Sequence, residues 1–314
     1  MNKKLILRAS GKFEDLFKNI KGGCAKCTPS GVVKNNDDIF VVFDNCKNIA
    51  RLAVMGPITK PIISGKEWLS ITLPTKSKIK GFAGVSCNSM KFNDDNLYMV
   101  VESVKRVMKK KSGKKKILYN GKVVIIAKNL NGKENWLDYE LPSKVKGFEG
   151  IGIINNQDDD QPRLLALCEG NCCRTGIPSK IPGSGRIQVF KPGEDKWQHD
   201  LQISLPDNVN FIDYSELDII ANKKGTDGSV VILSNASRKL WVGMLDLINF
   251  EWQGRGVIYD FPSNKNNEFC NVKGVAWLDD KCQKVIVVSS SSKNSKKDLE
   301  CKYYEQAIHL LELP

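Results

Sequence analysis

Two sets of mostly polar positions recur along this sequence beside apolar runs. The first set directly precedes a short apolar run and comprises Ser30, Ala83, Glu149, Ser215 and Lys273. The second set ends a β-rich run and comprises Asp44, Glu102, Glu169, Asn235 and Ser290. Carboxylates that converge in a confined space repel one another, so they imply a bound cation, a shared proton or a basic partner.

Glu149 is compatible with three kinds of chemistry. It could pair with Lys273 as a structural ion pair, or it could ligate a hard cation such as calcium together with Glu169. It could also act as a general acid or base, and Glu102 and Glu169 are then the further catalytic candidates. A structural alternative is that these carboxylates cap strand ends and bond loop amides. The sequence fixes no cofactor, and calcium is the one that this pattern allows.

Ten cysteines leave the redox compartment open, because they permit either disulfides or buried thiols. A disulfide-stapled loop is expected at residues 167–173, LCEGNCC. Neither His199 nor His309 lies in a motif that would activate a cysteine nucleophile, and Cys24-x-x-Cys27 has no second CxxC at zinc-site spacing. We expect a soluble protein, secreted if the cysteines are disulfide-bonded and cytoplasmic otherwise.

The positive charge of the chain is concentrated in one segment. Residues 105–116, KRVMKKKSGKKK, carry eight Lys or Arg and no acid, and without them the net charge of +13 falls to +5. The segment lies between two apolar β-like runs, which predicts an exposed hairpin loop. A solvated loop or an anion-contacting arm fits it, and the lack of aromatic residues argues against nucleic acid as a partner.

Three signatures recur five times in the same order. One has Trp as its second residue in four copies and ends with an apolar residue and Pro: residues 67–74, 135–142, 196–206, 251–262 and, without the Trp, 307–314. The second surrounds the first polar set at residues 29–33, 81–87, 147–154, 213–220 and 271–278. The third is a short β-rich run that follows each second signature. Repeated units of 50–70 residues with about four short strands are typical of propeller blades.

The sequence therefore predicts an all-β, five-bladed β-propeller in one domain, 1–314. The expected blades are 29–74, 75–142, 143–206, 207–262 and 263–314, and residues 1–28 form an N-terminal closure segment. A six-bladed ring, with the sixth blade in residues 1–28, is the alternative. In such a ring both polar sets line the axis, which gives a ligand-binding channel at Ser30, Asp44, Glu102, Glu149, Glu169, Ser215, Asn235 and Lys273.

Several of these segments resemble a known family. FEGIG (148–152), LLALCEGN (164–171), DYSEL (213–217), LWVG (240–243) and CNVKGVAWL (270–278) resemble the phytase-like and SdiA-regulated propeller proteins. FEGI at 148–151 is also similar to the motif of five-bladed calcium-activated nucleotidases, which implies a calcium role for Glu149. The equivalent positions in this chain hold Ala83 and Lys273, which departs from that pattern.

These patterns favour a binding propeller whose polar channel takes a small molecule or a protein. The alternative is a metal-dependent phosphoester hydrolase, phytase-like or nucleotidase-like, in which Lys273 stabilises phosphate charge. We expect a monomer. No run of residues is apolar and long enough to predict a membrane span.

Overall fold

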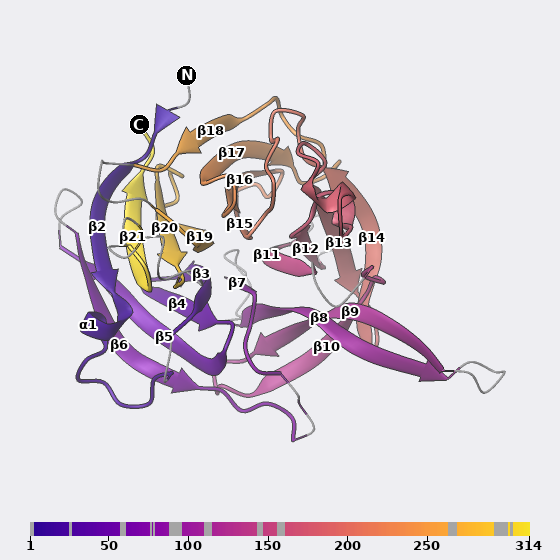
Figure 1. The fold of residues 1–314 in the computed structure, drawn as a ribbon, viewed down its shortest axis with the longest axis horizontal. Helices are drawn as coiled ribbons and strands as arrows, with labels where there is room; N and C mark the ends of the chain where they lie inside the picture. Colours follow the sequence, from indigo (N-terminus) through magenta and orange to yellow (C-terminus); the bar gives the residue numbers. More distant parts are fainter. Residues whose placement is uncertain are drawn as a thin grey trace.

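The computed structural model shows an all-β chain whose sheets are arranged around a common centre (Figure 1). The architecture is compatible with a β-propeller. The structure describes residues 3–24, 27–56, 61–75, 77, 79–87, 96–109, 115–142, 147–155, 161–262, 269–291, 301 and 304–314. Among these residues, no helix has the length and apolar character needed to cross a membrane.

The described strands form four sheets, in each of which successively named strands are hydrogen-bonded to one another. The first contains β3 (Pro29–Asn35), β4 (Asp38–Phe43), β5 (Cys46–Met55) and β6 (Ile62–Ser70). The second contains β11 (Phe148–Asn155), β12 (Pro162–Cys168), β13 (Arg186–Pro192), β14 (Lys196–Ser204), β10 (Gly132–Asp138), β9 (Lys115–Ile126), β8 (Leu97–Lys109) and β7 (Gly84–Cys87). The third contains β1 (Lys3–Lys4), β18 (Val257–Asp260), β17 (Lys239–Asp246), β16 (Asp227–Ser234) and β15 (Glu216–Ala221). The fourth contains β19 (Val272–Trp277), β20 (Lys284–Ser289), β21 (Ala307–Glu312) and β2 (Ile6–Lys12).

The innermost strands form a closed ring. Strands β3, β7, β11, β15 and β19 contact one another in that order, and β19 contacts β3. We call these strands the central ring. The eight-stranded sheet contributes two of them, because β10 and β14 pair in parallel and join two antiparallel four-stranded sets.

The two ends of the chain meet in the fourth sheet (Figure 1). Strand β2 pairs antiparallel with β21, so an N-terminal strand forms the outer edge of the sheet that contains the C terminus. Helix α1 (Phe13–Leu16) follows β2 and buries Phe13 in the apolar layer beside the first sheet. Two short 3₁₀ helices, η1 (Asn171–Cys173) and η2 (Pro178–Lys180), lie in the loop between β12 and β13.

The Trp-to-Pro signature has different positions in different sheets. Trp68, Trp136 and Trp197 lie in β6, β10 and β14, the fourth strand of each antiparallel set. The last copy instead forms β21, the third strand of its sheet, because β2 occupies the fourth place.

Apolar layers between neighbouring sheets form the core. In β16, residues 230–233 are fully buried, and alternate side chains enter different layers. Val230 and Ile232 pack in the layer that contains Trp241, whereas Val231 and Leu233 pack in the layer that contains Trp277. Because both faces of the sheet are covered, the strand is a continuous apolar run rather than an alternating one.

Candidate functional site

β-Bulges position three members of the first polar set. The register shifts between Phe148 and Gly150 in β11, and equivalent shifts bracket Ser30 and Lys273 at the start of β3 and β19. A bulged residue leaves the regular ladder, which lets its side chain point in a direction that the flat strand does not allow. Glu149, Ser30 and Lys273 are these bulged residues.

Three carboxylate side chains lie close together near the start of strand β11. Side-chain oxygens of Glu102, Glu149 and Glu169 all lie within 4.8 Å of one another. Glu102 lies in a second bulge, between Val101 and Val104, and Glu169 directly follows β12. We call these three residues the carboxylate cluster. Three of the candidate site residues predicted from the sequence therefore lie close together.

Lys273 lies beside the cluster. Its Nζ is 3.7 Å from Oε2 of Glu149, whose side chain is only 10% exposed. Burial raises the pKa of Glu149 to about 8; Lys273 opposes this rise, and Glu169, Glu102 and Asp44 add to it. When Glu149 is ionised, its attraction raises the pKa of Lys273 above its usual range. At neutral pH the site therefore combines a permanent ammonium with a carboxyl group that tends to hold a proton.

The remaining nominated residues have mainly structural contacts. The Ser30 hydroxyl donates to the carbonyls of Phe82 and Val42, and thereby ties the start of β3 to the segment before β7. The Ser215 hydroxyl accepts from the backbone N–H of Asn235. Asp44 is exposed, and its charge acts on both Glu149 and Lys273.

Glu216 is a central residue that the sequence analysis missed. The first residue of each second-signature apolar run is glycine in four copies, and Glu216 replaces it in the copy at 213–220. A Cβ added to Gly31, Gly84 or Gly150 would lie within 3 Å of the Glu216 carboxyl oxygens. The Glu216 side chain thus reaches from β15 to the backbones of three other central-ring strands. Its position as the one exception to a glycine pattern is the signal that could have identified it.

The environment of Glu216 favours its neutral form. The residue is fully buried, and its Oε1 accepts from the backbone N–H groups of Ile151 (3.1 Å) and Leu217 (3.3 Å). Burial raises the pKa of Glu216 well above that of an ordinary glutamate, and backbone N–H groups offset this only in part. Burial also raises the pKa of Asp218, two residues further along β15, to about 6.

The carboxylate cluster has the donor chemistry of a hard-cation site. Calcium binds oxygen ligands at about 2.3–2.6 Å, so oxygens on opposite sides of the ion are about 5 Å apart. The 4.8 Å limit on the separations of Glu102, Glu149 and Glu169 fits that range. Lys273 is the competing cation, because its ammonium already lies next to Glu149.

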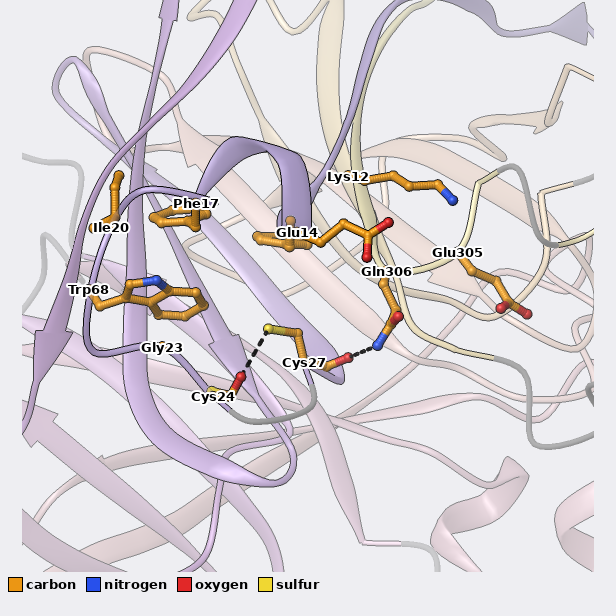
Figure 2. A pocket seen from close by; sticks show the side chains of 11 residues that line it. Lys12, Glu14, Phe17, Ile20, Gly23, Cys24, Cys27, Trp68, Glu305 and Gln306 are labelled. Atoms are coloured by element: carbon orange, nitrogen blue, oxygen red, sulfur yellow. Dashed lines mark hydrogen bonds between the residues drawn. The ribbon is translucent and has the colours of Figure 1, made fainter.

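A separate cavity of about 780 Å³ lies beside helix α1 (Figure 2). Phe17 and Trp68 line one side, and Cys24 and Cys27 line another. The amide of Gln306 donates to the carbonyl of Cys27 at 2.7 Å. Burial raises the pKa of the Cys27 thiol, which lowers its thiolate fraction at neutral pH and argues against a nucleophilic site in this cavity.

Three cysteine pairs lie at disulfide distance: Cys24–Cys46, Cys168–Cys173 and Cys270–Cys301. The second pair staples the loop that follows β12, next to Glu169. Cys27, Cys87, Cys172 and Cys282 are free thiols. This pattern is compatible with a secreted protein.

Comparisons with known proteins extend only to overall architecture. No family model and no curated protein matches the sequence. The structure is similar to glutaminyl cyclase from Myxococcus xanthus over 100% of both chains, at 9% identity and a TM-score of 0.46. It is similar to regucalcin, a calcium-binding protein from Agrobacterium tumefaciens strain C58, over 92% of this chain and 90% of that one, at 8% identity and a TM-score of 0.41.

A third similar structure is xylan β-1,4-xylosidase from Bacillus halodurans C-125, at 10% identity and a TM-score of 0.47. The match covers 85% of this chain and 50% of the xylosidase, so the chain spans half the length of that protein. Structural neighbours of the chain include propeller-like proteins. At these identities and TM-scores, the comparisons assign the chain neither a family nor an activity.

Proposed function

We propose that this protein is a ligand-binding propeller whose carboxylate cluster binds a divalent cation, with calcium as the best chemical fit. The observation that carries the proposal is the approach of side-chain oxygens of Glu102, Glu149 and Glu169 to within 4.8 Å of one another. Carboxylates at this spacing repel one another when they are ionised. A divalent cation that is ligated by all three carboxylates offsets this repulsion.

The proposal includes the architecture that holds the cluster. The five contacting strands of the central ring support a propeller of five blades, with boundaries near 29–74, 75–142, 143–206, 207–262 and 263–314. Residues 1–28 then act as the closure segment, and the pairing of β2 with β21 supports that role. With these boundaries Glu102 belongs to the second blade, and Glu149 and Glu169 belong to the third.

Thermal unfolding in the presence of cations tests the proposal. A ligand that binds only the native state raises the melting temperature once its concentration exceeds its dissociation constant. We expect millimolar calcium to raise the melting temperature of the wild type, magnesium to raise it less, and EDTA to reverse the effect. Glu149→Gln should abolish the shift, whereas Glu194→Gln, at an exposed turn between β13 and β14, should retain it.

A third variant separates cation binding from a closed ion pair. Lys273→Met removes the ammonium next to Glu149, so calcium should bind more tightly to this variant than to the wild type. If neither the wild type nor Lys273→Met responds to calcium, the carboxylate cluster is not a cation site.

The alternative function is metal-dependent hydrolysis of phosphoesters. Lys273 favours it, because an ammonium beside a bound divalent cation could stabilise charge on a phosphate group. The resemblance of FEGIG at 148–152 to phytase-like propellers supports the same alternative. A panel of phosphomonoesters and nucleotides with calcium or magnesium tests it, and turnover no higher than that of Glu149→Gln would exclude it.

A further inference from the structure

Strands β8 and β9 extend beyond the sheet to which they belong (Figure 1). They are 13 and 12 residues long, whereas β7 pairs only with residues 97–100 of β8, and β10 only with residues 122–126 of β9. Residues 104–109 and 115–120 pair with each other beyond those limits. We call these two paired segments the arm.

One face of the arm combines exposed apolar and basic side chains. Val107 and Ile117 are cross-strand partners and are 53% and 51% exposed. Lys105 precedes Val107 by two residues and Lys115 precedes Ile117 by two, so all four side chains lie on the same face. Both lysines are exposed. The apolar pair is therefore bracketed by positive charge.

The opposite face attaches the base of the arm to the protein. The guanidinium of Arg106 lies 5.4 Å from the centre of the Trp136 ring, a cation–π contact. Lys116 pairs with Glu140 at 3.0 Å, and the backbone of Tyr119 accepts from Leu141. These contacts orient the arm and leave the face with Val107 and Ile117 outward.

We propose that this outward face of the arm binds the surface of an anionic phospholipid membrane. Phosphate headgroups complement Lys105 and Lys115, and the boundary between headgroups and acyl chains accepts the aliphatic side chains of Val107 and Ile117. Neither interaction alone holds a protein firmly at a membrane, whereas a basic patch and an apolar insertion act together. The arm supplies both from two adjacent strands.

A nucleic acid fits the same face less well. Its phosphates would also attract the lysines, but single-stranded binding sites use aromatic side chains to stack on bases. The exposed apolar side chains of this face, Val107 and Ile117, are aliphatic, whereas Tyr119, the cross-strand partner of Lys105 on the same face, is partly buried against the core. An exposed aliphatic pair gains little from contact with a phosphate backbone, which is why a membrane is the occupant that matches both halves of the surface.

Co-sedimentation with phospholipid vesicles tests the proposal. The purified full chain is mixed with vesicles of phosphatidylcholine alone, or with about one third phosphatidylserine, at low and high salt. Two double variants separate the contributions: Val107→Ser with Ile117→Ser, and Lys105→Gln with Lys115→Gln. Ile177→Ser removes an aliphatic side chain that is 81% exposed elsewhere, and it is the matched control. Melting temperatures establish that all variants are folded.

We expect the wild type and the control to bind the anionic vesicles in a salt-sensitive manner and to bind neutral vesicles weakly. Each double variant should lose about tenfold or more in vesicle affinity. Absence of wild-type binding to anionic vesicles overturns the proposal. A second outcome would also overturn it: the serine double variant binds as well as the wild type, whereas the glutamine double variant does not bind. The arm would then recognise polyanions in general, and heparin or duplex DNA would compete equally well with the vesicles.

Discussion

Replacement of Glu216 tests whether the buried carboxyl at the centre of the ring holds a proton. Glutamine has nearly the same shape as a neutral glutamic acid and keeps an oxygen that can accept from the N–H groups of Ile151 and Leu217. Glycine restores the residue that the other copies have at this position. The two substitutions therefore separate loss of the proton from loss of the side chain.

The expected magnitudes follow from burial and hydrogen bonding. In the unfolded chain Glu216 ionises near pH 4.5, whereas burial raises its pKa in the folded protein. The folded state thus binds the extra proton, and the free energy of unfolding of the wild type falls as pH rises through this window, by about 1.4 kcal/mol per pH unit. The free energy of unfolding of Glu216→Gln does not fall in this way, because glutamine does not ionise. Glu216→Gly leaves two buried N–H groups without an acceptor, at a cost of about 1–3 kcal/mol each.

Urea unfolding at pH 5, 6, 7 and 8 measures these differences. Glu216→Gln should be close to the wild type at pH 5 and should become progressively more stable than the wild type towards neutral pH. Glu216→Gly should be less stable than Glu216→Gln at every pH. Comparison with the wild type cancels the contribution of Glu149, which both proteins share. A constant difference between the wild type and Glu216→Gln from pH 5 to pH 8 would show that the folded carboxyl is ionised, and it would refute the reasoning.

Three further predictions address the cation site, the loop beside it and the covalent links. Calcium affinity should rise by about one to two orders of magnitude between pH 6 and pH 8, because the ion must displace the proton that a pKa of about 8 keeps on Glu149; calorimetric titrations that show no pH dependence would contradict this. Asn171→Ala should lower the urea-derived free energy of unfolding by about 3 kcal/mol or more, because the two N–H groups of this buried amide are shared among three backbone carbonyls and its oxygen accepts from the backbone N–H of Ser184; a loss below 1 kcal/mol would contradict it. Loss of the Cys270–Cys301 link, which spans 31 residues, should cost about 3–4 kcal/mol, so a reductant should lower the melting temperature of the wild type more than that of a variant with serine at both positions.

Some features of the site follow from local sequence. The alternation of short apolar runs with Gly, Asn, Asp and Pro predicts an all-β fold, which the structure confirms. The second signature marks Glu149 and Lys273 as equivalent positions in two copies, and both lie in bulges of central-ring strands. Local sequence specifies such features because turns, bulges and strand alternation depend on neighbouring residues.

Other features required the tertiary structure. The approach of Glu102, Glu149 and Glu169 depends on the register and bulges of separate strands, which no single segment specifies. The cysteine partners depend in the same way on distances between loops that are far apart in sequence.

The sequence by itself determined the strand-forming runs, the repeated order of the signatures and the mostly polar character of the positions at the start of each unit. Only the tertiary structure decided that β2 completes the sheet of β21, that Lys273 lies 3.7 Å from Glu149, and that Glu216 fills the space left by glycines on other strands. The physical reason is that strand formation depends on side-chain patterns over a few residues. Distances across the ring depend instead on how sheets from the whole chain pack together.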